Sequence, residues 1–375
     1  MPSDSPSRDE PRRILQVLPR GMRYSQDSAT SVDLFVCEMA AHSRFRVDVV
    51  AESGDRPLPA ISVHELPPFA IAKTQRRARL VAALARELKP SAVVVQQHLP
   101  SAAALRARTP FPVILQKHNF LRPSRAAAWL RDASRWRRTR QLNALAGLTF
   151  VSETVLADFE RDWPEVTTPR RVVPNGVDIA AWAPRSERAK DVLAVGRSTP
   201  EKGLLEAAQA LAVVLPRHPD WTTTFVVSEP DRFPSYFTAL TKALAPLGPR
   251  ARLRVGAPFH EVKALNEAAA IALAPSVWRE PFGRTCLEAH AGGAAVVSSG
   301  SGGLREISGD AALYLSTVDA AQIAESVETL IMDEPLRNRL SAAGRARIER
   351  LFELRRVAAG LDDFCAETIE RAARG

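Results

Sequence analysis

Short runs of β-branched and apolar residues alternate with longer amphipathic stretches along most of the chain, and this alternation constrains the fold more than any other feature. It is the pattern of βαβ units built on a parallel sheet. Runs such as residues 92–95 are continuously apolar, as strands are when helices bury both of their faces. The sequence therefore predicts an α/β protein with doubly covered sheets.

The pattern of strands starts afresh near the middle of the chain. The expected strands are residues 14–18, 46–51, 61–66, 92–97, 113–117 and 148–151, and then 192–195, 223–227, 252–255, 271–274 and 294–297. Between the two sets, around residues 177–190, Pro184 and a polar stretch interrupt the alternation. A chain of 375 residues also exceeds the about 100 to 200 residues of one domain. We therefore expect two doubly wound domains, residues 1–180 and 181–352, and a C-terminal helix, 353–375, that packs back on the first domain.

Several classes of protein are excluded by what the sequence lacks. No apolar run reaches the about 20 residues that a helix needs to cross a bilayer core. The first 13 residues contain no apolar segment of the kind found in a secretory signal, so we expect a cytoplasmic protein. Three scattered cysteines, Cys37, Cys286 and Cys365, are too few for a disulfide framework or a zinc site, and we expect reduced thiols.

Positive charge is concentrated in the first half of the chain. Residues 1–184 contain 27 Lys and Arg against 18 Asp and Glu, whereas residues 185–375 contain 24 of each. The excess indicates an anionic partner for the first domain, either a membrane surface, an anionic acceptor or nucleic acid. The alternative is a compositional bias, since Arg outnumbers Lys by 44 to 7.

Two cations frame the turn after the first strand of the second half. Arg197 ends that strand, and Lys202 stands at the start of the next helix. Ligands of parallel sheets bind beyond the carboxyl ends of strands, where a helix N-terminus adds partial positive charge. The pair is a candidate for binding a diphosphate, although surface residues around an ordinary turn would have the same pattern.

Two glutamates, Glu280 and Glu288, follow a later strand. Eight helical residues span about 12 Å, more than the roughly 5 to 9.5 Å between the paired carboxylates of a glycosidase. The acids are expected to contact different parts of one elongated ligand, because carboxylates accept hydrogen bonds from sugar hydroxyls. Gly283, between them, lets backbone amides come close to a ligand.

Two further strand ends have a polar or glycine-rich sequence. His118 follows the strand 113–117 and is either a ligand-binding residue or a structural histidine. A loop with Gly302, Gly303 and Glu306 follows the last expected strand and is either part of a binding site or a plain turn.

In their order and context these segments resemble the retaining glycosyltransferases of family 4, the glycosyl transferases group 1. The resemblance rests on residues 173–178 (VPNGVD), on Gly196-Arg197 with Lys202-Gly203, and on residues 280–289. It covers most of residues 110–360. It implies the GT-B architecture, in which two Rossmann-like doubly wound domains face each other across a cleft.

The resemblance implies roles for the residues of the second domain. Arg197 and Lys202 would bind the diphosphate of a nucleoside diphosphate sugar. Glu280 would contact the transferred sugar as a catalytic residue, and Glu288 the ribose. Backbone amides of the two residues Phe282 and Gly283 would approach the sugar and the phosphate.

In the first domain the resemblance is less complete. His118 matches the histidine that lies beside the donor sugar in many relatives and is expected to orient or polarise it as a catalytic residue. The family often has paired glycines after the first strand, where this chain has only Gly21. Gly21 is therefore a weaker candidate for the diphosphate site.

The expected chemistry is transfer with retention at the anomeric carbon, in which a donor phosphate oxygen accepts the proton of the acceptor hydroxyl. Cations and helix N-termini would stabilise the leaving diphosphate. No Asp-x-Asp sequence occurs, so the usual acidic clamp for a divalent cation is missing and we expect neither metal nor cofactor. The acceptor is expected to be a saccharide or lipid-linked precursor of a cell-surface polysaccharide, lipopolysaccharide or glycolipid, with no nucleic acid as partner.

Two other functions stay open at this stage. One is a nucleotide-sugar epimerase of the same fold, and the other is a basic membrane- or nucleic-acid-binding protein without catalysis. The arginine-rich helix expected over residues 125–146 carries Trp129 and Trp136 on one face, a composition typical of helices at the inner surface of a membrane. A second basic helix, residues 73–88, carries Arg76, Arg77 and Arg79. In the alternative both tryptophans pack in the core.

Overall fold

A computed structural model describes residues 12–19, 22, 31–52, 61–67, 73–123 and 128–374 of the chain. It divides into two compact units, one made of Met1–Gly176 with Leu354–Gly375 and the other of Val177–Glu353. We expected these divisions at residues 180 and 352. None of the helices in the described part is long and apolar enough to cross a membrane.

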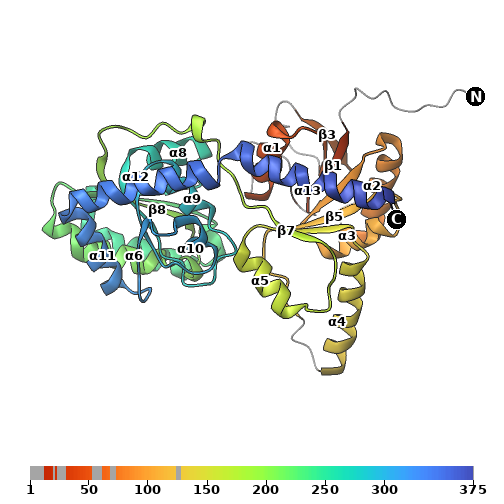
Figure 1. Cartoon of the computed structure of the whole chain (residues 1–375). Coiled ribbons are helices and arrows are strands. Elements are labelled where there is room, and N and C mark those ends of the chain that lie inside the picture. The colour runs from red at the N-terminus through yellow and green to blue at the C-terminus, as the bar shows by residue number, and fades with distance from the viewer. Residues whose placement is uncertain are drawn as a thin grey trace, which may run out of the picture. The chain divides into compact units, whose positions relative to one another are not determined.

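The N-terminal unit is built on a seven-stranded sheet in the order β3-β2-β1-β4-β5-β6-β7, and every neighbouring pair is parallel (Figure 1). Its strands are β1 (Arg13–Val17), β2 (Arg46–Glu52), β3 (Ser62–Leu66), β4 (Ala92–Gln96), β5 (Val113–Lys117), β6 (Gly147–Phe150) and β7 (Arg170–Val172). Its helices are α1 (Ser31–His42), α2 (Thr74–Leu88), α3 (Leu99–Arg106), α4 (Ala128–Asn143), α5 (Glu153–Asp162) and α13 (Leu354–Arg374). All six expected strands are confirmed, and only the three-residue β7 was not expected.

The last helix, α13, belongs to the N-terminal unit. It lies beside α1 (Figure 1), and its apolar residues Leu354, Leu361 and Phe364 join the core that α1 forms on the sheet. A polar contact adds to this packing, because the carboxylate of Asp362 accepts hydrogen bonds from the hydroxyl of Ser43 and from the following backbone amide, both at 2.7 Å. The chain thus returns to its first unit after completing the second.

The C-terminal unit is built on a six-stranded parallel sheet in the order β10-β9-β8-β11-β12-β13. Its strands are β8 (Ala189–Arg197), β9 (Thr222–Ser228), β10 (Ala251–Val255), β11 (Ala269–Ala274), β12 (Ala295–Ser298) and β13 (Ala312–Tyr314). Its helices are α6 (Leu204–Val214), α7 (Pro234–Leu244), α8 (Phe259–Ala268), α9 (Arg284–Ala291), α10 (Gly303–Ser308), α11 (Ala320–Met332) and α12 (Glu334–Leu351). The five expected strands are confirmed, and β13 was not expected.

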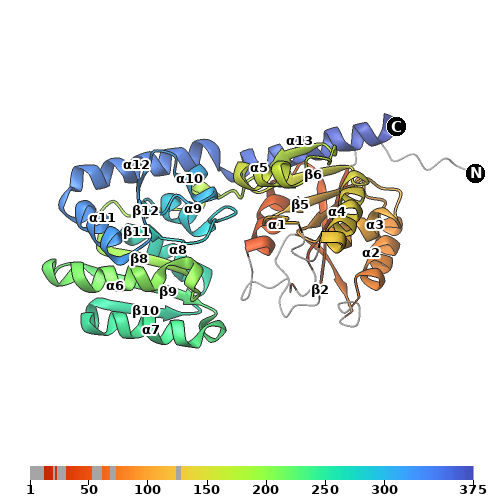
Figure 2. The same cartoon turned by 90° about the horizontal axis from the view of Figure 1, so that it is seen from below.

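Alternate residues of β8 explain why this sheet needs helices on both faces. Val192 and Ala194 point into the core shared with α6, α7 and α11, whereas Leu193 packs with Val262 of α8 on the other face. Successive side chains of a strand point to opposite faces, so a continuously apolar strand is stable only between two layers. Figure 2 shows α6 and α7 beside one another in this unit.

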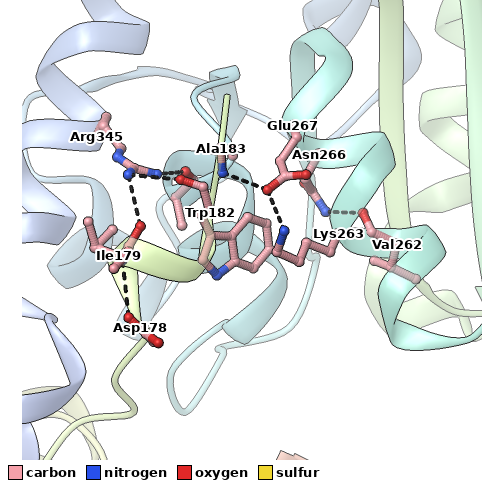
Figure 3. A network of polar contacts seen from close by, with 12 residues as sticks. Asp178, Ile179, Trp182, Ala183, Val262, Lys263, Asn266, Glu267 and Arg345 are labelled. Atoms are coloured by element: carbon pink, nitrogen blue, oxygen red, sulfur yellow. Dashed lines mark hydrogen bonds and ion pairs between the residues drawn. The ribbon is translucent and has the colours of Figure 1, made fainter. Parts of the chain in front are cut away.

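The segment that opens the C-terminal unit is fastened to it by polar contacts (Figure 3). Nη2 of Arg345 in α12 donates to the backbone oxygens of Ile179 and Trp182, at 3.0 and 3.2 Å. The carboxylate of Glu267 in α8 accepts a hydrogen bond from the backbone amide of Ala183 at 2.7 Å. These contacts satisfy backbone groups that no strand pairs.

Two of the arginines expected on a basic surface have other partners. Arg77 of α2 is buried and donates to the backbone oxygen of Leu18 at 2.6 Å, so it is not a surface cation. Arg135 of α4 forms an ion pair with Glu165 at 2.8 Å. The burial of Arg77 corrects the expectation for that position, whereas Arg135 stays partly exposed with its charge paired.

Trp136, one of the two tryptophans expected on the surface of α4, is exposed. Trp136 is 65% exposed, and the guanidinium of Arg140 lies 5.6 Å from its ring centre. The idea that Trp136 packs in the core is therefore wrong. The side chains of residues 124–131, which include Trp129 and Arg131, lie outside the described part of the structure.

Candidate functional site

Three loops of the C-terminal unit follow three adjacent strands, β8, β11 and β12, at their carboxyl ends (Figure 2). The order of strand addition reverses between β8 and β11. The chain adds β9 and β10 on one side of β8, and then returns to add β11, β12 and β13 on the other side. Ligands of open parallel sheets bind at such a point. Lys202, Glu280 and the glycine loop all lie on these three connections.

The central contact joins the loop after β8 to the loop after β11. Nζ of Lys202 lies 2.5 Å from Oε1 of Glu280, and the hydroxyl of Ser276 donates to the same oxygen at 2.6 Å. The ring of Trp278 lies beneath the ammonium, whose nitrogen is 5.8 Å from the ring centre. Glu280 is only 5% exposed, so its carboxylate and the ammonium of Lys202 are held in a fixed, poorly hydrated position.

Two glycines allow the loops to approach this closely. Gly203, with a φ of 66°, ends the 3₁₀ turn Pro200–Lys202, and a Cβ there would lie 2.1 Å from the backbone oxygen of Pro275. Gly302, with a φ of 63°, would bring a Cβ within 2.2 Å of the backbone oxygen of Glu280. Any side chain would push the loops apart, since positive φ and close approach both favour glycine.

Further charges at this edge are paired in a similar way. Nη2 of Arg197, at the end of β8, lies 3.0 Å from a carboxylate oxygen of Glu201. Nε of Arg284 lies 2.8 Å from Oε1 of Glu288 within α9, and both side chains are largely buried, with 10% and 8% exposed. The structure thus brings Lys202 and Glu280 into contact, whereas Arg197 and Glu288 contact other partners.

The expected backbone donors lie at the start of α9. Phe282 is buried, and its ring centre lies 5.9 Å from that of Phe352. Gly283 is the N-cap of α9 with a φ of 109°, and its backbone oxygen accepts from the amide of Cys286 at 3.0 Å. Glu306 lies in α10, directly after the glycine loop.

In the N-terminal unit His118 follows β5 and rests on a row of glutamines. Its Nε2 lies 2.6 Å from Oε1 of Gln96, and the amide nitrogen of Gln96 donates to Oε1 of Gln16 at 2.7 Å and of Gln116 at 3.3 Å. With the amide assigned by these contacts, Nε2 of His118 is the donor and Nδ1 is left unprotonated. The ring of Phe35 packs edge-on against the imidazole at 5.2 Å.

Burial holds this histidine in its neutral form. Removal from water, and secondarily the charge of Lys117, lower the pKa of His118 to about 3. A group with so low a pKa is a poor general acid or base near neutral pH. The geometry therefore suits a hydrogen-bonding or orienting role.

Several residues of these sites were missed by the sequence predictions. Gln96 and Gln116 stand out as amides in otherwise apolar strands, which is a signal that could have been used. Ser276 and Arg284 gave no such signal, because their roles depend on which carboxylate lies beside them. Gly21 lies outside the described residues.

Comparisons with known proteins match both halves of the chain to glycosyltransferase families. Residues 29–181 match the model described as Glycosyltransferase Family 4, and residues 180–347 match Glycosyl transferases group 1. Together the two models extend over residues 29–347.

Among curated proteins, the glycogen synthase of Mycobacterium tuberculosis is 32% identical over 194 residues, which are 50% of this chain and 46% of that protein. The alpha-maltose-1-phosphate synthase of Mycolicibacterium smegmatis is 29% identical over 260 residues, 60% of this chain and 64% of that protein. The chain thus spans about half to two thirds of the length of these relatives.

Solved structures share the fold at low sequence identity. The sucrose-phosphate synthase of Thermosynechococcus elongatus superposes with a TM-score of 0.76 at 18% identity, over 96% of this chain and all of that one. HepE of Anabaena, in complex with UDP and glucose, gives a TM-score of 0.73 at 17% identity, over 95% of this chain and all of that one. The expected GT-B fold, with its two Rossmann-like doubly wound domains, is confirmed. On these matches the chain is an enzyme of the group 1, family 4 glycosyltransferases.

Proposed function

We propose that the enzyme transfers a sugar from a nucleoside diphosphate sugar to a hydroxyl group of its acceptor, with retention at the anomeric carbon. The observation that supports this most directly is the contact of Lys202 with Glu280 between the loops after β8 and β11. A cation for the diphosphate and an acid for the sugar stand side by side there. HepE of Anabaena, which shares the fold, binds UDP and glucose.

In this proposal the second unit binds the donor. Lys202 and Arg197 contact the diphosphate, and Glu288 contacts the ribose. Backbone amides near Phe282 and Gly283 approach the sugar and phosphate. Fixed cations in a poorly hydrated site stabilise the charge that develops on the leaving diphosphate, which is why they lower the barrier.

Glu280 contacts the transferred sugar. Its Oε1 already accepts from Lys202 and Ser276, so the second carboxylate oxygen is the one that we assign to a sugar hydroxyl. The same contact keeps the ammonium of Lys202 pointed at the site. The diphosphate then shares this cation with Glu280.

His118 orients or polarises the sugar through a neutral imidazole. Its lowered pKa supports a role without proton transfer. The proton of the acceptor hydroxyl passes instead to a donor phosphate oxygen on the same face of the sugar ring, as retention requires. We propose that neither a divalent cation nor another cofactor takes part, because the chain has no Asp-x-Asp sequence.

The acceptor proposed here is a saccharide or lipid-linked precursor of a cell-surface polysaccharide, lipopolysaccharide or glycolipid, reached at the cytoplasmic face of a membrane. The exposed Trp136 beside Arg140 on α4 favours such a surface. An indole next to a guanidinium suits the headgroup layer of anionic lipid, where the ring is buried and the cation contacts phosphate.

The experiment that tests the proposal has two steps. A thermal-shift screen over nucleoside diphosphates and their sugars identifies the donor, because ligand binding raises the apparent melting temperature. The anomeric configuration of the product is then read by NMR with a ¹³C-labelled donor and an acceptor extract. An α-linked product from an α-linked donor supports retention, and an inverted product contradicts it. Consumption of the donor to a free or epimerised sugar without acceptor indicates the epimerase instead.

A further inference from the structure

The N-terminal unit contains a cavity of about 610 Å³ that the proposed donor site does not use. Its walls come from α2, α3 and α4, which follow one another side by side (Figure 1), and from the end of β5. The wall formed by α3 is apolar, with Leu99, Pro100 and Ala103 among its residues. Leu121, beyond β5, extends this apolar surface.

The rest of the cavity is strongly positive. Four cationic side chains line it, namely Arg108, Lys117, Arg137 and Arg138, and none of the lining residues that the structure describes is an aspartate or glutamate. A cavity of this charge concentrates anions, because the low-dielectric walls focus the field of the cations.

The known contacts of these cations leave their charge uncompensated. Lys117 donates to the backbone oxygen of Gln97 at 2.8 Å, Arg108 to that of Ala104 at 2.9 Å, and Arg138 to that of Arg122 at 3.1 Å. Backbone oxygens are neutral acceptors, so each hydrogen bond orients its cation without cancelling the charge. Arg135, also on α4, differs in having the carboxylate of Glu165.

Lys117 is the most unusual of the four. It is only 4% exposed, and burial lowers its pKa to about 7. A buried ammonium without a carboxylate is unfavourable for folding, since its hydration is lost and no opposite charge replaces it. A dianion in the cavity would supply that charge.

We propose that this cavity binds a phosphoryl group of the acceptor, held by Lys117, Arg137 and Arg138, while the apolar wall of α3 packs against the carbon atoms next to the phosphate. A phosphate monoester matches the cations with a charge of about −1.5 to −2 near neutral pH and three strong acceptor oxygens. The inference rests on the proposed function and names the class of its acceptor, a phosphate-bearing one. The phosphate belongs either to a lipid or to a water-soluble sugar phosphate.

The test is calorimetric titration of the full chain with three probes, in the presence of saturating UDP so that the donor site is occupied. Octyl phosphate represents a lipid phosphate, glucose 6-phosphate a soluble sugar phosphate, and octyl glucoside a neutral amphiphile. We expect one of the two phosphates to bind and the glucoside not to bind. Which phosphate binds more tightly distinguishes the two sources.

Substitutions assign the binding to the cavity. K117M and R138Q should each lower the affinity for the phosphate probe by about tenfold or more, as expected for the loss of a charge-assisted contact. R106Q is the matched control, because Arg106 ends α3, which forms one wall of the cavity, but does not itself line the cavity. If K117M fails to fold, R138Q gives the answer alone. Hydrogen exchange of the unsubstituted protein should also show the probe protecting α3 and α4.

The outcomes separate this inference from the proposed function. Absence of phosphate binding, or equal weakening of that binding by R138Q and R106Q, overturns the inference even when UDP binds normally. Phosphate binding that depends on Lys117 and Arg138, in a chain that binds no nucleoside diphosphate, supports the anion site but contradicts the donor proposal.

Discussion

Nζ of Lys202 and Oε1 of Glu280 lie 2.5 Å apart, although 78 positions separate them in the chain. Both side chains are largely buried, with 18% and 6% exposed. In such a pair the two opposite charges attract each other strongly, because little water screens them. A substitution at Glu280 therefore also changes the cation that we assign to the diphosphate.

We predict that E280Q lowers kcat by about 10²-fold, which is typical for loss of one transition-state contact, with little loss of affinity for UDP. The amide still accepts from Lys202 and Ser276 but no longer offsets the charge of the ammonium. E288Q should instead lower the affinity for UDP by about tenfold and affect kcat less, because the ribose hydroxyls lose a charged hydrogen-bond acceptor. Steady-state kinetics and calorimetry measure the two effects. An equal loss of UDP affinity in both variants would show that the division between sugar and ribose is wrong.

Replacing Arg197 and Lys202 together by alanine should reduce the binding free energy of UDP by several kcal/mol, which lowers the affinity by about 10²-fold or more. Charge-assisted contacts to a diphosphate are among the stronger hydrogen bonds. K242A is the control, since Lys242 is an exposed lysine of α7 in the same unit. Calorimetry with UDP checks the result. Unchanged binding in the double variant would reject the diphosphate assignment.

Activity should survive a chelator. The diphosphate charge is met by Arg197 and Lys202 in our proposal, and the sequence has no Asp-x-Asp clamp for a divalent cation. Transfer assays with and without EDTA should give the same rate. Loss of activity in EDTA that magnesium or manganese restores would contradict the prediction.

Lys117 should make stability depend on pH. Its pKa is 10.5 ordinarily and about 7 in the folded chain, so between these values the unfolded state binds the additional proton and the free energy of unfolding rises with pH. K117M removes this dependence. The free energy of unfolding of K117M minus that of the unsubstituted protein should therefore be about 2 kcal/mol smaller at about pH 9 than at about pH 7. Urea unfolding at the two pH values measures the difference. A constant difference would mean that Lys117 keeps its ordinary pKa.

Membrane docking through α4 predicts binding to anionic vesicles that weakens with salt, since attraction between surface charges is screened within a Debye length. W136A should reduce co-sedimentation because it removes an exposed apolar ring beside Arg140. M332A is the control, as Met332 is 71% exposed but belongs to the C-terminal unit. Equally low recovery with anionic and neutral vesicles would indicate a soluble acceptor.

The sequence by itself determined the two doubly wound sheets. Eleven strands could be located because continuous apolar runs between amphipathic stretches have few other stable arrangements than a sheet covered on both faces. The short strands β7 and β13 were missed, since three residues contain too little of the pattern. The motifs also indicated which strand ends would carry the charged residues.

Only the tertiary structure decided which charges meet. Sequence spacing did not show that Lys202 contacts Glu280, that Arg135 pairs with Glu165, or that Arg77 is buried against Leu18. Nor did it show that Lys117 lines a cationic cavity with residues of α3 and α4. The physical reason is that apolar periodicity is a local property of the chain, whereas the partner of a charged side chain depends on which loops and helices the completed sheet brings together.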